Sequence, residues 1–311
     1  MNRRPQICVV GSSNVDLIAR VPRFPRPGET LEGRSFHIGY GGKGANQAVM
    51  AAKLGARVTM VTRVGRDVFG DGMLRNFTRH GIDTTHVHVD EARSSGVAPI
   101  LVDDTAENEI VIVPGANHGL SPDDVRHAAS ALQAADVVIG QLEVPVETTL
   151  EAFRVARAAG VRTILNPAPA VPLSDDLLAL TDLCVPNEAE AEMLTGRPVP
   201  SVDAAAEAAG VLRGRGARTV ILTLGGRGVV LVDADGTHHV PAVPVEAVDA
   251  TGAGDAFIGS LAVFLAEGHT ARGAARRANA VAALSVTALG AQGSFPERAA
   301  ADAFLAARGV T

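Results

Sequence analysis

Short apolar runs rich in β-branched residues recur along the chain and are separated by stretches with helical periodicity. The apolar runs lie at residues 7–10, 58–64, 136–141, 162–166, 182–186, 219–225 and 228–232. Alanine-rich stretches with helical spacing lie between most of them, for example at residues 45–56, 146–160 and 202–217. Strands and helices that alternate in this way predict an α/β fold, with a central, mostly parallel sheet and helices on both faces.

Two segments interrupt this alternation. Residues 17–41 alternate between apolar and polar side chains, contain three prolines and carry no helix signal. Residues 96–117 have the pattern of a β-hairpin with a polar turn near residues 103–108. We expect both segments to form a small second sheet, which either closes over a ligand as a lid or is a surface flap without function. The whole chain, residues 1–311, is thus expected to be one α/β domain that carries this sheet.

Composition narrows the classes of function. The chain has 311 residues, of which 47% are hydrophobic and 20% are charged, as in an ordinary globular protein. A net charge of −6 and the lack of a long Lys/Arg cluster argue against binding to nucleic acid or to an anionic membrane surface. A phosphate group would therefore be held at one local site.

Three further features indicate a cytoplasmic protein. Cys8 and Cys184 are too few for a disulfide scaffold, and the N-terminus lacks the apolar core of a signal peptide. The least charged stretch, residues 278–293, is interrupted by polar side chains, so it predicts a buried helix and not a membrane span.

The glycine-rich stretch GYGGKGANQA, residues 39–48, contains the spacing G-x-G-x-x-G. A dinucleotide-binding fold places that spacing directly after its first strand, where this chain has GSSNVD, and the stretch is no Walker A loop either. What remains is a turn that brings Lys43 and Asn46 to the start of a helix. Such a pair suits a polyhydroxyl ligand or an anion, although a solvated lysine at a helix start is the simpler explanation from these residues alone.

Polar residues follow several predicted strands, at the sheet edge where α/β proteins bind ligands. Asn14 and Asp16 come after the first strand, and together they can hold a diol or form an Asx turn. Glu143 follows a later strand in the same way. Asn187 and Glu190 are explained equally well as the cap and the first-turn acid of a helix.

The stretch LTLGGRG, residues 222–228, leaves a strong strand through a glycine turn. Gly225, Gly226 and Gly228 could form a β-hairpin, or they could let a nucleotide approach the backbone closely. The residues alone leave both possibilities open.

The stretch VDATGAGDAFIGS, residues 248–260, combines a glycine turn suited to an anion with an aspartate. Free N–H groups at a helix start attract negative charge, whereas the carboxylate of Asp255 repels it. Phosphoryl transfer reconciles the two, since the N–H groups would stabilise the phosphoryl charge while Asp255 takes the proton of an attacking hydroxyl. A helix start with a stabilising acid in its first turn is the simpler alternative.

Six motifs occur along the chain in this order: GSSNVDL near the start, GGKGANQAV, NPAPA, PNEAEAEMLTG, LTLGGRG and VDATGAGDAF. The same motifs in the same order are typical of the ribokinase-like (PfkB-type) carbohydrate kinases, and the chain resembles this family over essentially its whole length. The resemblance implies a mostly parallel sheet flanked by helices, with a small β lid that often doubles as a dimer interface. It therefore also implies a homodimer.

The resemblance carries roles over to individual residues. It implies that Asp255 is the general base on the primary hydroxyl of a sugar, and that Gly252, Ala253 and Gly254 form the anion hole for the γ-phosphate. The residues that would hold the sugar together with Asp255 are Asn14, Asp16, Gly42, Lys43, Asn46 and Glu143. The residues that would line the nucleotide are Asn187, Thr223, Gly225, Gly228, Gly254 and Asn279.

Two metal ions are implied as well. Glu190 would organise Mg²⁺ through water, and a potassium-type cation would lie beside the anion hole, bound largely by backbone carbonyl groups. The positions that match the cation site are Asp249, Thr251, Ser285, Ala288, Gly290 and Ser294. One departure concerns Asn279, which stands where some members of the family carry a histidine near the adenine.

The implied reaction transfers a phosphoryl group from ATP to the 5-hydroxyl of D-ribose, with Mg²⁺ and K⁺ as cofactors. The alternative is another sugar or nucleoside, namely 2-deoxyribose, fructose, ketodeoxygluconate or adenosine. A non-catalytic sugar-binding relative and a nicotinamide oxidoreductase are rival classes of protein. The intact GAGD sequence argues against the first, and the position of GYGGKG argues against the second.

Overall fold

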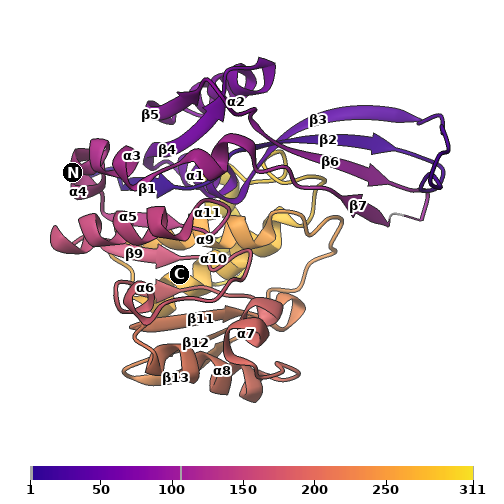
Figure 1. Cartoon of the computed structure of the whole chain (residues 1–311). Coiled ribbons are helices and arrows are strands. Elements are labelled where there is room, and N and C mark those ends of the chain that lie inside the picture. The colour runs from indigo at the N-terminus through magenta and orange to yellow at the C-terminus, as the bar shows by residue number, and fades with distance from the viewer. Residues whose placement is uncertain (1–2, 106, 311) are drawn as a thin grey trace.

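A computed structural model of the chain describes residues 3–105 and 107–310. Within these residues the larger of two sheets has nine strands, in the order β13-β12-β11-β10-β9-β8-β1-β4-β5 (Figure 1). Its strands are β1 (Gln6–Val10), β4 (Arg57–Gly65), β5 (Asp83–Asp90), β8 (Val137–Gly140), β9 (Arg162–Leu165), β10 (Leu183–Cys184), β11 (Thr219–Thr223), β12 (Val229–Asp233) and β13 (Gly236–Val240). The strands from β5 to β11 in this order are parallel, and β12 and β13 continue the sheet antiparallel at one edge.

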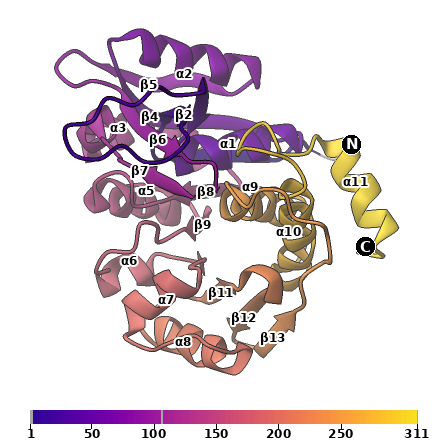
Figure 2. The same cartoon turned by 90° about the vertical axis from the view of Figure 1, so that its right-hand side faces the viewer.

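Helices cover both faces of this sheet, because its central strands are apolar on both faces. Ile7 and Val9 of β1 pack into one hydrophobic cluster, and Cys8 and Val10 pack into the other. The helices of the first cluster are α1 (Lys43–Lys53), α2 (Val68–Arg79), α9 (Ala253–Ala266), α10 (Ala271–Ser285) and α11 (Arg298–Ala307). Those of the second are α3 (Pro122–His127), α4 (Ala129–Ala134), α5 (Val146–Ala158), α6 (Asp175–Ala179), α7 (Glu188–Thr195) and α8 (Val202–Gly214). Figure 2 shows α9 and α10 on one side and α5 to α8 on the other, and the expected α/β fold is confirmed.

A smaller sheet projects from the body (Figure 1) and confirms the second sheet expected from the sequence. Its strands are β2 (Asn14–Arg20), β3 (Ser35–Gly41), β6 (Gly96–Val102) and β7 (Asn108–Ile110), in the order β3-β2-β6-β7. Strands β2 and β6 pair in parallel with Asn14 opposite Gly96, so the two segments that interrupt the α/β alternation meet in one sheet. The sheet leaves the body directly after β1, beside the carboxyl edge of the large sheet.

The structure corrects some details of the elements expected from sequence. The helix expected over residues 278–293 ends at Ser285, and the residues after it form turns around Gly290, whose φ is +81°. The run at residues 182–186 contributes only the two-residue strand β10. Two short 3₁₀ turns, Gly115–Gly119 and Gly225–Arg227, complete the elements. Among the described residues, no helix is both long and apolar enough to cross a membrane.

Candidate active site

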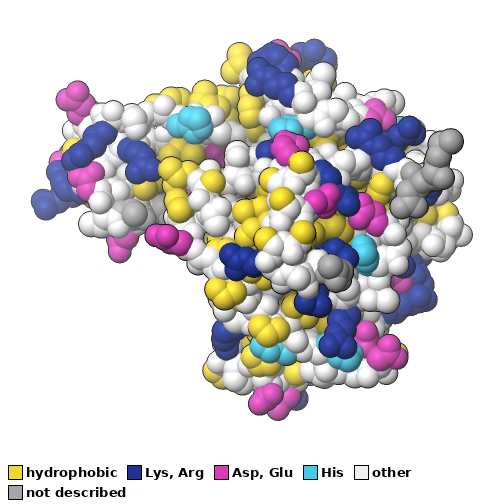
Figure 3. All heavy atoms as spheres, turned by 180° about the vertical axis from the view of Figure 1, so that it is seen from behind, with side chains coloured by type: hydrophobic (Ala, Val, Ile, Leu, Met, Phe, Trp, Pro, Cys, Tyr) yellow, Lys and Arg dark blue, Asp and Glu magenta, His cyan; other side chains and the backbone are white. Residues whose placement is uncertain are grey.

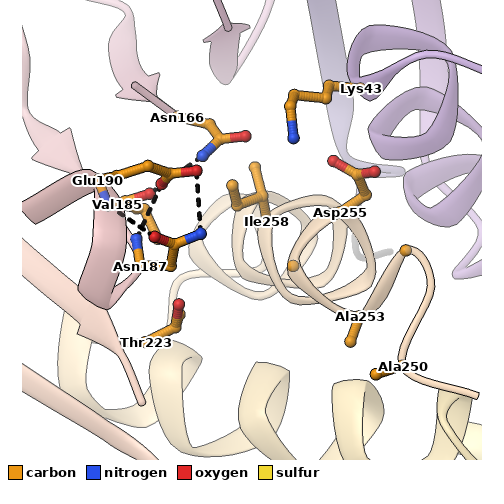
Figure 4. Close-up of a pocket in the computed structure, with 12 residues that line it drawn as sticks. Lys43, Asn166, Val185, Asn187, Glu190, Thr223, Ala250, Ala253, Asp255 and Ile258 are labelled. Carbon is orange, nitrogen blue, oxygen red and sulfur yellow. Dashed lines mark hydrogen bonds between the residues drawn. The ribbon is translucent and has the colours of Figure 1, made fainter. Parts of the chain in front are cut away.

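A cavity of about 190 Å³ opens at the carboxyl edge of the large sheet (Figure 4). Asn166 and Val185 follow β9 and β10, Thr223 ends β11, and the start of α9 closes the other side. The residues that line the cavity are Lys43, Asn166, Val185, Asn187, Glu190, Thr223, Ala250, Gly252, Ala253, Gly254, Asp255 and Ile258. The structure thus brings together residues from both ends of the chain that the sequence marked separately.

Helix α9 begins at this cavity with the predicted anion-binding turn. Gly252 is the residue before the helix and has a left-handed backbone with φ of +79°. The first N–H groups of an α-helix have no acceptor within the helix, and the helix dipole places partial positive charge there. Ala253 and Gly254 line the cavity. The N–H of Ala253 donates to the Ala250 carbonyl oxygen at 3.1 Å, whereas that of Gly254 has no acceptor among the described residues, so this turn can bind an anionic group.

Asp255 lies in the first turn of α9 and is buried, with 8% of its surface exposed. Its Oδ2 accepts a hydrogen bond from Asn46 Nδ2 at 2.9 Å, and its Oδ1 accepts one from Gln47 Nε2 at 2.9 Å. Burial raises the pKa of the carboxyl group to about 6, although the charge of Lys43 and the two amide donors oppose this rise. A carboxylate with this pKa is ionised at neutral pH and is basic enough to accept a proton from a hydroxyl.

A second set of polar side chains lies around the start of α1. The Glu143 carboxylate accepts hydrogen bonds from the backbone N–H of Lys43, at 3.0 Å, and from the Ser12 hydroxyl group. Burial, with the charge of Glu143, raises the pKa of Asp16 to about 6. The carboxylate of Glu143 thus interacts with those of both Asp16 and Asp255, and Lys43 acts on Asp255 as well. Carboxylate groups can accept hydrogen bonds from the hydroxyl groups of a ligand.

Asn14 lies where the two sheets meet. It is buried, and its Oδ1 accepts a hydrogen bond from Asn117 Nδ2 at 2.7 Å, while the Asn117 side chain also bonds to the backbone of Ser13. A side chain at Gly96 would collide with Asn14 Oδ1, since a Cβ there would lie 2.2 Å from it. Asn14 therefore has a structural task at this junction besides any contact with a ligand.

Asn187 and Glu190 serve as a helix cap and also line the cavity. Asn187 Oδ1 accepts a bond from Glu190 N at 2.8 Å, and Glu190 Oε2 accepts one from Asn187 N at 2.8 Å, which is a capping box. Figure 4 shows both side chains at the end of the cavity opposite Lys43, with Thr223 below them. The helix cap is therefore present, and the same two side chains lie where a ligand in the cavity could contact them.

The glycines after β11 form a hairpin turn between β11 and β12. Gly228 has a φ of +89°, and a Cβ there would lie 2.1 Å from the carbonyl oxygen of Val240. This glycine is therefore needed for the close approach of two strands, whether or not a nucleotide binds nearby. Gly225 lies in the same turn and, like Gly228, does not line the cavity of Asp255.

Asn279 lies beside a separate cavity of about 270 Å³. Its Nδ2 donates a hydrogen bond to the carbonyl oxygen of Pro241 at 2.9 Å, which leaves its side-chain oxygen available as an acceptor. The walls of this cavity come from the segment after β13, from α10 and from the C-terminal segment. Asn279 is thus placed in a hollow lined by apolar and basic residues.

The positions of the proposed cation site come from two loops that contact each other. The backbone N–H groups of Val248 and Asp249 both donate to the carbonyl oxygen of Val286. The Asp249 carboxylate accepts from Thr251 N at 2.9 Å and from Gly290 N at 2.8 Å, so it clamps the two loops together. Ser285 and Ser294 donate their hydroxyl groups to carbonyl groups of their own segments. Among the described residues, no cluster of three His, Cys, Asp or Glu side chains has the geometry of a metal site.

Three site residues were missed by sequence reasoning. Asn166 lines the cavity directly after β9, so it carries the same signal as Glu143, a polar residue at the end of a strand. Gln47, which donates to Asp255, and Gln141, which donates to Gln47, are both fully buried. They have no local signal, because a glutamine within a helix or after a strand is common and only the tertiary fold brings these two together.

A glycine turn at a helix start, a buried carboxylate and several polar side chains meet at this cavity, an arrangement that is compatible with transfer of a phosphoryl group to a hydroxyl. The chain also matches the family described as pfkB family carbohydrate kinase over residues 4–298. It belongs to this family and is an ATP-dependent sugar kinase.

Individual relatives agree with this assignment. A deoxyribokinase of Salmonella typhi is 45% identical, over 93% of this chain and 95% of its own length. A ribokinase of Haemophilus influenzae is 43% identical, over 95% of this chain and 96% of its own. The crystal structure of an Arabidopsis thaliana ribokinase complexed with ribose and ATP superposes with a TM-score of 0.91 at 31% identity, over 97% of this chain and 99% of that one.

Proposed function

We propose that this sugar kinase transfers the γ-phosphoryl group of ATP to the 5-hydroxyl of D-ribose, giving D-ribose 5-phosphate and ADP. The observation that carries the proposal is the Asp255 carboxylate, which is buried at the start of α9 between two amide donors and Lys43. The ribokinases among the relatives, at 43% identity for the Haemophilus influenzae protein, support ribose as the acceptor.

In the proposed reaction Asp255 is the general base. Its carboxylate takes the proton of the 5-hydroxyl as the hydroxyl oxygen forms a bond to the γ-phosphorus. The bond from that phosphorus to the bridging oxygen breaks, and its electron pair leaves with ADP. The N–H groups at Gly252, Ala253 and Gly254 stabilise the charge on the phosphoryl oxygens during the transfer.

The sugar is proposed to lie among the polar groups around Lys43, and the nucleotide at the opposite end of the cavity. Asn14, Asp16, Gly42, Asn46 and Glu143 complete the sugar site. The nucleotide site is proposed to extend from Asn187 and Thr223 past the turn with Gly225 and Gly228 to the hollow beside Asn279.

The proposed cofactors fit the donor groups present. Bound Mg²⁺ neutralises phosphate charge, and it prefers oxygen ligands and keeps several waters. Glu190 suits such a hydrated ion, because both of its carboxylate oxygens already accept bonds from Asn187. K⁺ would be held by backbone carbonyl groups of the two loops joined by Asp249, at the positions of Thr251, Ser285, Ala288, Gly290 and Ser294.

A second candidate acceptor is 2-deoxyribose, because the Salmonella typhi relative at 45% identity is a deoxyribokinase. The two sugars differ by one hydroxyl group, so a few hydrogen bonds in the pocket decide between them.

The test is ADP release from Mg-ATP with D-ribose, 2-deoxyribose, fructose, ketodeoxygluconate or adenosine, each with K⁺ and again with Na⁺. We expect D-ribose to give the highest kcat/KM and K⁺ to raise the rate. A higher kcat/KM for 2-deoxyribose would favour the second candidate. Equal rates in K⁺ and Na⁺ would contradict the cation site, and no acceleration by any of the five would contradict the proposed reaction.

The projecting sheet is proposed to hold two copies of the chain together as a homodimer and to act as a lid. Its edge strands β3 and β7, with the residues after β7, expose large apolar side chains, namely Phe36, Ile38, Ile110, Val111 and Ile112. Apolar side chains are visible on this sheet in the view from behind (Figure 3). Apolar patches on exposed edge strands favour association with another chain.

Light scattering coupled to size exclusion tests this association. We expect a dimer for the wild-type chain and a monomer for a Phe36→Asp, Ile110→Asp double variant. A wild-type monomer at micromolar concentration would contradict the dimer.

A further inference from the structure

Gln47 holds one oxygen of Asp255 from a position behind the pocket. It is fully buried in α1 and does not line the cavity. Its Nε2 donates to Asp255 Oδ1 at 2.9 Å and to Asn166 Oδ1 at 3.2 Å, and its Oε1 accepts from Gln141 Nε2 at 2.7 Å. Both hydrogens of the amide and its oxygen are therefore engaged.

The neighbouring side chains fix the direction of this amide. Asn166 Nδ2 donates to the carbonyl oxygen of Val185 at 3.2 Å, so the Asn166 oxygen is the atom that faces Gln47. Gln141 presents its Nε2 to the Gln47 oxygen on the other side. If the Gln47 amide turned over, its oxygen would face two other oxygens and its nitrogen would face a donor.

Gln141 keeps this position at a cost. Its Oε1 is buried and has no hydrogen-bond partner among residues 3–105 and 107–310. It also lies so close to Gly11 that a Cβ there would be 1.8 Å from it. A buried amide oxygen without a partner destabilises the fold. The orientation that Gln141 imposes on the Gln47 amide gives a reason why a glutamine stands at this position in spite of that cost.

We propose that Gln47 is a positioning residue for the general base, and that Gln141 sets the direction in which Gln47 donates. This inference rests on the proposed function, in which Asp255 accepts the proton of the sugar hydroxyl. Asn46, which is 7% exposed, holds the other carboxylate oxygen, whereas Gln47 is fully buried and acts from within the core. Gln47 therefore fixes the carboxylate without taking space from the sugar.

The same hydrogen bond also favours the ionised form of Asp255. The charged groups that face this carboxylate are Lys43 from α1, Glu143 after β8 and Glu190 from α7. Lys43 favours ionisation and the two carboxylates oppose it. Loss of the donor at Gln47 therefore raises the pKa of Asp255 further, toward neutral pH.

The test compares Gln47→Met and Gln141→Met with the control Thr148→Val. Met has nearly the length of Gln but donates no hydrogen bond. For Gln47→Met we expect kcat near pH 7 to fall about 10- to 100-fold, with the acid limb of the kcat profile moved up by about one pH unit. For Gln141→Met we expect a smaller change in the same direction, because the Gln47 amide loses the donor that faces its oxygen and is held less firmly, while Asn166 and Asp255 still oppose its turning over. The KM for ATP should not change in either variant.

Thr148→Val removes a buried hydrogen bond at a residue that does not line the pocket, since the Thr148 hydroxyl donates to the carbonyl oxygen of Leu120 at 2.8 Å. It should lower stability and leave the acid limb in place. An unmoved acid limb in both glutamine variants, as in this control, would overturn the proposal. If Gln47→Met does not fold, Gln141→Met decides by the same criterion.

A titration separates this inference from the proposed function. With ¹³C-labelled aspartate carboxyl groups, the signal of Asp255 is the one missing in Asp255→Asn, and its pKa is measured without turnover. We expect this pKa to rise in Gln47→Met. If Asp255→Asn keeps its turnover, the base assignment fails. If Asp255→Asn is inactive and the pKa is the same in Gln47→Met and wild type, only the role of Gln47 fails.

Discussion

Helices α1 and α9 pack against each other on one face of the large sheet, and each follows a glycine with positive φ. Gly42 precedes α1 with φ of 87°, and Gly252 precedes α9 with φ of 79°. Neither position has room for a side chain, since a Cβ would lie 2.8 Å from Asn14 N at the first and 2.9 Å from the Ala291 Cβ at the second.

The two helix starts differ in what occupies their N–H groups. At α1 the Glu143 carboxylate accepts a hydrogen bond from the N–H of Lys43, so an anion of the protein itself already fills this place. At α9 the N–H of Ala253 donates to the carbonyl oxygen of Ala250 at 3.1 Å, so a neutral carbonyl and not a carboxylate occupies it. The next residue, Gly254, lines the cavity, and its N–H has no acceptor among the described residues. A glycine turn before a helix therefore does not by itself define an anion site. Whether the helix start can bind an anion from solution depends on whether a carboxylate of the protein already accepts its hydrogen bonds.

The largest expected effect lies at α9. Asp255→Asn removes the proposed base, and we expect kcat to fall by about 10²- to 10⁴-fold, the usual contribution of a general base. The far-UV circular dichroism spectrum should stay unchanged, because Asn has nearly the same shape. Turnover close to that of the wild-type chain would contradict the base assignment.

Replacement of the two glycines tests whether the turns are equally constrained. Gly42→Ala and Gly252→Ala each force a side chain into positive φ and into a close contact, which costs about 2–4 kcal/mol. We expect Gly42→Ala to cost more, because its Cβ meets the backbone of Ser13 and Asn14, whereas at Gly252 the nearest atom belongs to the loop residue Ala291. Urea unfolding measures both, and a lower stability for Gly252→Ala would reverse this ranking.

Glu143→Gln tests the start of α1, where the Glu143 carboxylate accepts the hydrogen bond of Lys43 N. The variant weakens a charge-assisted hydrogen bond to Lys43 N, and we expect kcat/KM for the sugar to fall about 10- to 100-fold. The acid limb of the profile should move to lower pH, because the Glu143 charge raises the pKa of both Asp16 and Asp255. The KM for ATP is the internal control, and a change confined to ATP would contradict this assignment.

Much of the fold could be predicted from the sequence, because strands buried on both faces have continuous apolar runs. Strands β5, with sequence DTTHVHVD, and β13, with GTHHV, were missed because they are polar edge strands. Strand β10 was predicted from the apolar run at residues 182–186, but only two of these residues form it. Local patterns thus reveal buried strands and miss polar strands at the edges of the sheet.

The same distinction applies to the site. Glu143 and Asp255 could be predicted, because each follows a strand or a glycine turn that marks it locally. Gln47 and Gln141 could not, because their task depends on partners that come from α1, β8 and α9 together. Asn187 and Glu190 show a third case, in which a helix cap and a pocket wall are the same residues.

The last expected effect is a change of folding stability with pH that comes from Asp255 at the start of α9. The pKa of Asp255 is about 6 in the folded chain and 3.8 is its ordinary value, so between these values the folded state binds more protons than the unfolded state. Stability from this group is therefore complete below about pH 4 and is lost as the pH rises through 6, a change of about 3 kcal/mol. Urea unfolding from pH 4 to 7 should show this loss in the wild-type chain, and the difference from Asp255→Asn isolates it.

The test depends on how the difference in folding stability between the wild-type chain and Asp255→Asn changes with pH, and not on its value at one pH. In Asp255→Asn an amide nitrogen must face either Asn46 Nδ2 or Gln47 Nε2, so a donor meets a donor and the variant loses stability at every pH. That loss of stability does not depend on pH, whereas the contribution from the ionisation of Asp255 does. If the difference in stability between the two chains does not change from pH 4 to 7, the Asp255 carboxyl group has an ordinary pKa. Its place at the start of α9 would then affect its ionisation no more than a position open to solvent does.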